Sequence, residues 1–489
     1  MVNLPWRISV RVMGLIKKIA LVLGTTLVVL LAVRVYLSQQ GSDLHLWHTW
    51  KADEMTVREM DKSDYAHYVA RENAIFTDLD NSVTAKSGAE DRTPLNRYYR
   101  KSLVWPGQFA PDANRSFVLM PAGTPRGAVV LLHGLTDSPY SVRHLALDYQ
   151  RRGFVAVAPR LPGHGTAPGA LTNVDWEMWM AATRLAVREA TRLAGDKVPL
   201  HLVGYSNGGA LAMKYALDAL DSAQLRKPQQ LVLLSPMIGV TSFARFAGLA
   251  GLPAMLPAFA KAAWLTIAPE YNPYKYNSFP VNAARQSWLL TQALQEQLGR
   301  DAREHRLDDL PPVLAFQSVM DSTVSTRAVV TELFERLPEN GSELVIFDIN
   351  QAGSFRPLFK PASWTAVSEL LPPQVRRYTV TTIANASEHS LDAVAKTTPA
   401  GQTRERVEPL STPYPAEIYS LSHVAVPFPP NDDLYGRHPE VKNRYGISLG
   451  TIELWGETSV LSVSKDALMR VTSNPFYGYM EERINEKMD

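Results

Sequence analysis

The sequence contains no cysteine. This absence excludes structural disulfides, thiolate catalysis and cysteine-ligated zinc, although it does not identify the compartment. An excess of one charge is also missing, because 50 lysines and arginines balance 48 acidic residues and leave a net charge of +2. No long basic run and no zinc-knuckle or aromatic-basic pattern occurs, so we expect no nucleic-acid partner. The histidines and carboxylates lack i, i+4 ligand pairs, and we therefore predict no metal site.

Long apolar runs are rare, and the clearest one lies near the N-terminus at residues 19–33, "IALVLGTTLVVLLAV". Counted through Leu37, a helix here would be about 28 Å long, close to the thickness of a bilayer core. Basic residues precede the run: Arg7, Arg11, Lys17 and Lys18. They favour a cytoplasmic N-terminus, with the rest of the chain on the non-cytoplasmic, periplasmic side. We predict an uncleaved signal anchor within residues 1–41; a cleaved signal peptide and a buried helix are the alternatives.

A regular alternation of buried strands and amphipathic helices follows an N-terminal extension, residues 42–110. Within the extension a helix is expected over 53–75, as a spacer or packed on the main domain, with no recognisable chemistry. Strands are predicted at 127–134, 154–160, 199–205, 230–236, 311–319 and 343–349, with helices at 141–153, 175–195, 207–220 and 325–337. Continuous apolar strands separated by helices predict an α/β fold, a mostly parallel sheet covered on both faces.

One long segment interrupts this alternation. Residues 237–310 are apolar and rich in alanine, proline and aromatic residues, too long for a simple βα connection, and we predict an inserted helical cap. The core would then comprise residues 111–236 and 311–430, with strands at 376–385 and 417–426, followed by a C-terminal extension, 431–489.

The stretch Gly204-Tyr205-Ser206-Asn207-Gly208 matches the nucleophile elbow G-x-S-x-G. Glycines two places before and after the serine let neighbouring chains approach a strained turn. The motif alone is weak, but here it lies where a predicted strand becomes a predicted helix, as the mechanism requires.

A second turn lies one βαβ unit earlier. His133 and Gly134 end the first long strand, and such a turn can aim backbone N–H groups at the nucleophile. The predicted oxyanion donors are the amides of Leu135 and Asn207.

The strings "LLHGLTDSPYS", "VAPRLPGHGTAPG" and "LVGYSNGG" resemble the α/β-hydrolase superfamily, in its monoacylglycerol-lipase, lysophospholipase and serine-aminopeptidase-like branch. The resemblance covers about residues 115–335. It implies a Ser-Asp-His triad in that chain order, with a cap inserted after the sixth strand.

The acid and base follow the cap. Asp321 ends the strand "PVLAFQSV" and is similar to the family's strand-Asp-x-x-Val pattern; the alternative is an N-cap. Two histidines after it, His389 and His423, fit a loop after a late strand, whereas His438 lies in a polar loop. We favour His423 for its small apolar flanks, with His389 as the alternative base. The interval of about a hundred residues from Asp321 departs from the family's few tens.

These residues predict a serine hydrolase acting on carboxylic or lipid esters through an acyl-enzyme, without a metal or organic cofactor. The apolar cap and the anchor favour an acyl chain, although the cap residues could equally pack on the core. A serine aminopeptidase-like peptidase, with Glu270 as a lone acidic candidate, and a non-catalytic binding module are the alternatives. Oligomeric state, acyl-chain length and the roles of residues 350–415 and 431–489 stay open.

Overall fold

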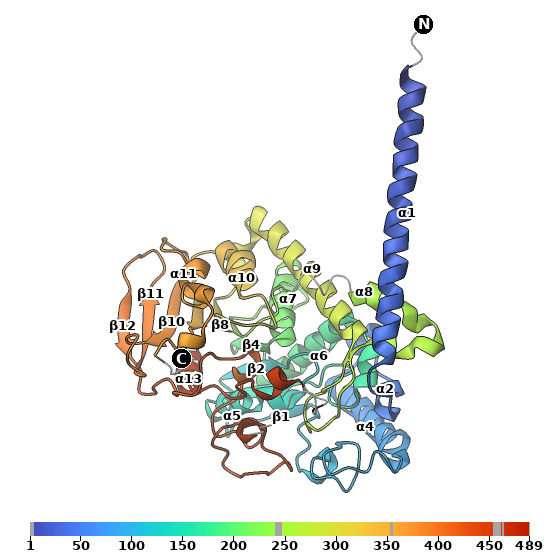
Figure 1. Ribbon diagram of the computed structural model, residues 1–489. Helices are drawn as coiled ribbons and strands as arrows, with labels where there is room; N and C mark the ends of the chain where they lie inside the picture. Colours follow the sequence, from blue (N-terminus) through green and yellow to red (C-terminus); the bar gives the residue numbers. More distant parts are fainter. Residues whose placement is uncertain (1–3, 240–246, 353–355, 453–460, 462–463, 489) are drawn as a thin grey trace.

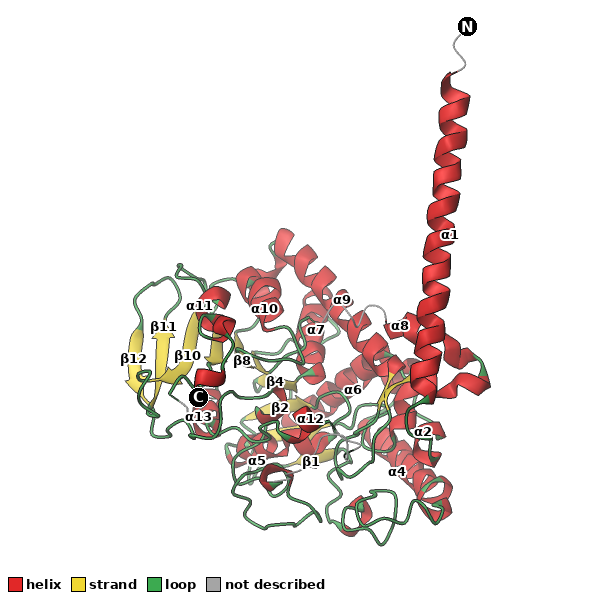
Figure 2. Ribbon diagram, viewed as in Figure 1, coloured by secondary structure: helices red, strands yellow, loops and turns green. Residues whose placement is uncertain are grey.

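A ten-stranded sheet forms the centre of the computed structural model, which describes residues 4–239, 247–352, 356–452, 461 and 464–488 (Figures 1 and 2). Its strand order is β1-β3-β2-β4-β5-β8-β9-β10-β11-β12. The strands are β1 (Phe117–Leu119), β2 (Gly127–Leu132), β3 (Phe154–Ala158), β4 (Leu200–Tyr205), β5 (Gln230–Leu234), β8 (Val313–Ser318), β9 (Glu343–Phe347), β10 (Thr379–Asn385), β11 (Ala393–Thr398) and β12 (Arg406–Pro409). The stretch from β3 to β10 is parallel, and antiparallel strands flank it on both sides.

Alternate residues of each central strand enter two separate hydrophobic cores. In β2, Ala128, Val130 and Leu132 pack with helices α6 (Trp176–Ala194), α7 (Asn207–Asp221) and α9 (Val281–Arg303). Val129 and Leu131 pack instead with α5 (Arg143–Arg151) and α13 (Tyr477–Asn485). Every residue of β2 to β5, β8 and β9 is therefore buried, which is why these strands read as continuous apolar runs.

The N-terminal extension packs against this core. The helix expected over 53–75 is two helices, α3 (Val57–Lys62) and α4 (Tyr65–Ser82), each with a polar N-cap, Thr56 and Asp64. The break between them follows from Asp64, whose carboxylate accepts the His67 N–H at 2.8 Å and starts a new helix. Helix α3 lies against α6 of the core.

The segment between β5 and β8 contains α8 (Ala247–Ala250), several short 3-10 turns, the two-stranded sheet of β6 (Trp264–Thr266) and β7 (Phe279–Pro280), and α9. Residues 240–246 of the predicted cap lie outside the described residues. Helix α9 of this segment packs on α7, α6 and α8.

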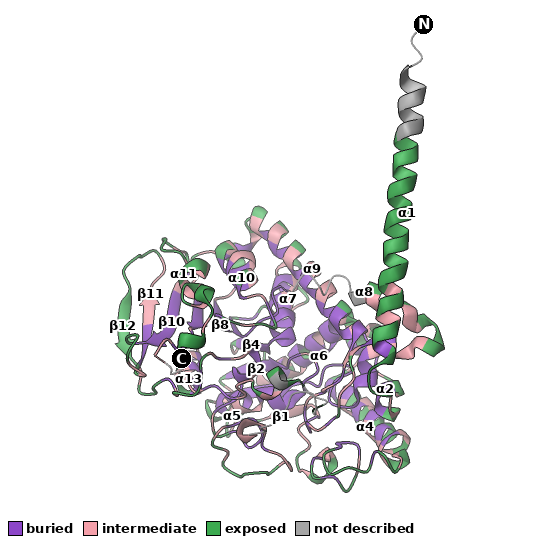
Figure 3. Ribbon diagram, viewed as in Figure 1, coloured by how far each residue is buried: buried purple, intermediate pink, exposed green. Residues whose placement is uncertain are grey.

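Helix α1 (Leu4–Gln39) projects from the globular part with its described side chains largely exposed (Figure 3). Residues 12–39 are long and apolar enough to cross a membrane, as a signal sequence also would be. Residues 1–3 of the predicted stub lie outside the described residues.

The late part of the chain departs from the predicted strand pattern. Strand β10 fits the expectation for 376–385, but residues 417–426 form no strand. Their apolar residues, Ile418, Leu421 and Ala425, recur every three to four positions and are buried, Leu421 and Ala425 within the core shared with α5 and α13. The adjoining sheet position beside β9 is already taken by β10, so the segment ends in the short 3-10 turn His423–Ala425.

Candidate active site

Ser206 lies in the turn between β4 and α7, as the sequence predicts, and is mostly buried. Its backbone has φ 54° and ψ −114°, a positive-φ conformation that non-glycine residues rarely adopt. A Cβ on Gly204 would overlap the Gly208 carbonyl, and a Cβ on Gly208 would overlap that of Leu132. Only glycines therefore allow β2, β4 and α7 to meet so closely around the serine.

Asp321 and His423 are brought together although they are 102 residues apart: His423 Nδ1 lies 2.7 Å from Asp321 Oδ2. Both side chains are buried, at 4% and 0% exposure. The His423 ring also packs on Tyr205, with ring centroids 5.5 Å apart, which places it beside the residue that precedes Ser206.

The Asp321 carboxylate has further donors. Oδ1 accepts the N–H groups of Thr323 and Val324 at 2.8 and 3.0 Å, and Oδ2 accepts Gln317 Nε2 at 2.9 Å. Burial acts to raise the pKa of Asp321, but the nearby His423 and these hydrogen bonds outweigh it and lower the pKa below its usual value. Asp321 is therefore an ionised acceptor that fixes the Nδ1–H tautomer of His423.

The interval between Asp321 and His423 is long because the chain forms three more strands before it returns to the end of β9. Beyond Asn350, three residues after the end of β9, the chain forms β10 to β12 and then returns, so that the Asn350 N–H donates to the Tyr419 carbonyl at 2.9 Å. The Asn350 side chain donates to the carbonyls of Pro415 and Ile418. Ser318, at the end of β8, donates to the Leu421 carbonyl at 2.6 Å. His423 thus lies at the carboxyl ends of β8 and β9.

The alternative base lies elsewhere. His389 is exposed in the loop between β10 and β11, and His438 is exposed as well.

The predicted oxyanion turn follows β2. His133 is fully buried, and its Nε2 accepts the Leu161 N–H at 3.0 Å. The ring proton must then be on Nδ1, which donates to the Gly134 carbonyl at 2.9 Å. Burial lowers the pKa of His133 well below its usual value, which keeps the ring neutral.

The two predicted donors are the amides of Leu135 and Asn207. In the described part of the chain, neither N–H has a hydrogen-bond acceptor. Asn207 is the first residue of α7, where the helix dipole favours negative charge.

Three polar residues near the site escaped the sequence interpretation. Gln317 donates to Asp321, and its only mark in the sequence is that it is a polar residue within an otherwise apolar strand. Asp137 is buried, and its carboxylate lies 3.3 Å from Lys275 Nζ of the inserted segment. Burial raises the pKa of Asp137, against the opposing charge of Lys275. Nothing local in the sequence connects these two residues.

A metal centre has no candidate in the described ranges, where no three His, Asp or Glu side chains are grouped to hold an ion.

The parallel sheet flanked by helices, with a strained serine at a strand-to-helix turn, has the arrangement of the α/β-hydrolase fold. Comparison with known proteins agrees. Residues 123–349 match the family model described as serine aminopeptidase, S33. Over 89 residues, 18% of the chain, the sequence is 33% identical to the thermostable monoacylglycerol lipase of Bacillus sp. (strain H-257), and the match spans 34% of that relative. The resemblance recognised in the sequence is confirmed over this core.

Several solved structures are similar to about half of this chain. A structure of the metagenome-derived lipolytic enzymes LipS and LipT has a TM-score of 0.40 and 20% identity, covering 53% of this chain and 97% of its own. The monoacylglycerol lipase of Paleococcus ferrophilus has a TM-score of 0.35 and 20% identity, covering 52% and 97%. The Saccharomyces cerevisiae monoglyceride lipase has a TM-score of 0.36 and 15% identity, covering 47% of this chain and 80% of its own.

Proposed function

We propose that the protein is a serine hydrolase that cleaves carboxylic or lipid esters, of the carboxylesterase, monoacylglycerol lipase or lysophospholipase type. The observation that carries the proposal is the Asp321–His423 pair packed beside the strained turn of Ser206. A serine hydroxyl is a weak nucleophile until a base accepts its proton, and the base needs a fixed tautomer to do so.

In the proposed reaction, Ser206 Oγ attacks the acyl carbonyl while His423 Nε2 takes the hydroxyl proton. Asp321 holds the imidazole and stabilises its protonated form. The N–H groups of Leu135 and Asn207 bind the oxyanion, and His423 returns the proton to the departing alcohol. Water then repeats the attack on the acyl-enzyme and releases the acid.

An ester is favoured over a peptide substrate by the surroundings of Glu270. A peptidase that recognises a free amino terminus needs an accessible carboxylate at the cleft. Glu270 is buried, and its oxygens accept the N–H groups of Asn277 and Ser278 at 3.0 and 2.8 Å. Asp137 faces Lys275, which already supplies a positive partner.

Contacts at the C-terminal end of α1 favour a lipid substrate and a role of this helix as a membrane anchor. Gln39 and Arg34 donate to backbone carbonyls of the inserted segment, Ala258 and Ala262, each at 3.3 Å. Beside this contact the inserted segment exposes apolar side chains: Leu249, Leu252, Met255 and Leu256. We propose that α1 is a single N-terminal anchor, with the catalytic domain on the non-cytoplasmic side and its apolar cap residues near the bilayer.

The test is labelling of the full-length protein with a fluorophosphonate probe. We expect the wild type to be labelled and Ser206→Ala to be silent. Ser235→Ala is the matched control, because Ser235 is also buried, also has a positive φ (44°), and follows the neighbouring strand β5. It should label as the wild type does. A folded wild type that does not react would refute the hydrolase assignment.

Turnover of p-nitrophenyl esters from acetate to palmitate, compared with aminoacyl p-nitroanilides, separates esterase from peptidase. Faster cleavage of the anilides would assign the peptidase alternative. Membrane fractionation of the full chain, with the mass of the recovered protein, distinguishes an anchor from a cleaved signal peptide.

A further inference from the structure

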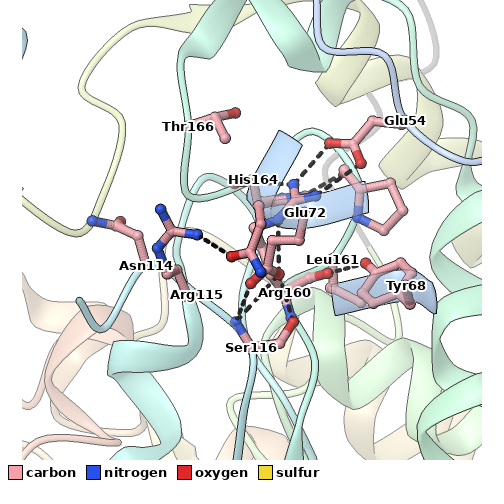
Figure 4. Close-up of polar contacts among 12 residues, drawn as sticks. Glu54, Tyr68, Glu72, Asn114, Arg115, Ser116, Arg160, Leu161, His164 and Thr166 are labelled. Atoms are coloured by element: carbon pink, nitrogen blue, oxygen red, sulfur yellow. Dashed lines mark hydrogen bonds and ion pairs between the residues drawn. The ribbon is translucent and has the colours of Figure 1, made fainter. Parts of the chain in front are cut away.

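A buried arginine joins the N-terminal extension to the loop that follows β3 (Figure 4). The Arg160 side chain is 1% exposed, and both of its acidic partners come from the extension. Glu54 binds it through two parallel hydrogen bonds of 2.7 and 2.9 Å, and Glu72 Oε2 lies 3.2 Å from Arg160 Nε. Bidentate pairing of this kind is strong and directional.

The same groups hold the backbone of the loop. Glu54 Oε1 accepts the Gly163 N–H at 2.7 Å, and Arg160 Nη1 donates to the His164 carbonyl at 3.0 Å. On the other side, Glu72 accepts Ser116 Oγ at 2.6 Å, and Ser116 Oγ accepts the Arg160 N–H at 2.8 Å. Residues 160–164 are therefore fixed from both sides by charged groups whose burial demands that they stay paired.

This loop touches the oxyanion turn directly. The Leu161 N–H, next to Arg160, donates to His133 Nε2 and thereby leaves the ring proton on Nδ1. His133 Nδ1 then donates to the Gly134 carbonyl. That carbonyl and the Leu135 N–H belong to the same planar peptide unit, so holding one end sets the direction of the other.

We propose that Glu54 and Glu72 are positioning residues for the oxyanion donor, and that the N-terminal extension is therefore a working part of the catalytic scaffold. The path runs from the two glutamates through Arg160 and Leu161 to His133 and the peptide that carries the Leu135 N–H. The proposal rests on the proposed function, because it treats that N–H as the donor to the tetrahedral intermediate.

The test compares Glu54→Gln and Glu72→Gln with Asp61→Asn in the full-length protein. Asp61 is a matched control, because it also joins the extension to the core, through two hydrogen bonds to Arg184 at 2.8 and 2.9 Å, but it does not contact the 160–164 loop. Turnover is expressed per serine titrated to completion with the fluorophosphonate, so that only folded sites are counted.

We expect kcat for a p-nitrophenyl ester to fall about tenfold in Glu54→Gln and about threefold in Glu72→Gln, with KM within twofold of wild type. The affinity for an alkyl trifluoromethyl ketone, which forms an oxyanion, should fall in parallel with kcat. Asp61→Asn should leave both unchanged. A merely structural role would reduce the number of titrated sites and leave both quantities per site intact.

Two results distinguish a failure of the positioning role from a failure of the proposed function. If both glutamine variants match Asp61→Asn in kcat and ketone affinity per site, the positioning role is refuted while the hydrolase assignment stands. If the wild type does not react with the probe, the proposed function itself fails. Should Glu54→Gln yield no titratable site, Glu72→Gln decides, since it keeps an oxygen that can accept from Ser116.

Discussion

Replacing Gly208 by alanine tests whether close packing around the elbow holds the nucleophile in place. The new Cβ would overlap the Leu132 carbonyl oxygen and lie 2.8 Å from that of His133, both backbone atoms at the end of β2. Neither atom can move alone, so either α7 or the oxyanion turn must shift, by about 1 Å. A misplacement of that size in an active site costs about a hundredfold in rate, and the overpacking costs about 1–3 kcal/mol in stability.

The assay is kcat/KM for a short p-nitrophenyl ester, with thermal unfolding followed on the same samples. Gly478→Ala is the control, because a Cβ there, near the start of α13, meets no atom within 4 Å. It should keep full activity and unfold at the same or a slightly higher temperature. Gly208→Ala with activity within threefold of wild type would show that the turn tolerates expansion and that the steric reasoning is wrong.

Three further predictions follow from the site and the core. Asp321→Asn should lower kcat by about 10³–10⁴-fold with little change in KM, because the asparagine no longer fixes the His423 tautomer; steady-state kinetics measures this. His423→Gln should abolish probe labelling, whereas His389→Gln, in its exposed turn, should react at the wild-type rate; the reverse pattern would move the base to His389. His201 is buried, and burial lowers its pKa to about 4, so the unfolded chain binds its proton first. Stability is therefore lost as pH falls from about 6.5 towards 4, by about 3 kcal/mol for this residue, and a folded His201→Gln variant should show a shallower decline in acid.

The core and the strained turn of Ser206 could be predicted because their signals are local. A buried parallel strand is apolar along its whole length, so β2 to β5 can be recognised from a few consecutive residues. An elbow needs its glycines within five residues, so the turn of Ser206 can be recognised in the same way. Asp321 could be placed for the same reason, at the end of β8.

Features that depend on residues far apart in the chain could not be predicted from the sequence. The apolar residues of 417–426 predict a strand that the structure does not have, because a short window does not reveal that β10 already occupies the position beside β9. Gln317 and Lys275 act on partners that only the fold supplies. The extension carried no recognisable chemistry in sequence, because Glu54 and Glu72 acquire their role only where they meet Arg160.

The hydrogen bond between Asn350 and Tyr419 determines how many residues the chain can insert before His423. Joining two points through a flexible loop costs an entropy that grows only with the logarithm of loop length, about 0.6 kcal/mol for each doubling. The free energy needed to close the loop from Asn350 to Tyr419 is therefore only about 2 kcal/mol higher than for a loop one tenth as long. The hydrogen bonds that Asn350 makes to the returning segment are enough to offset most of that difference. The number of residues between Asp321 and His423 can therefore vary widely, while the 2.7 Å contact between their side chains must be kept.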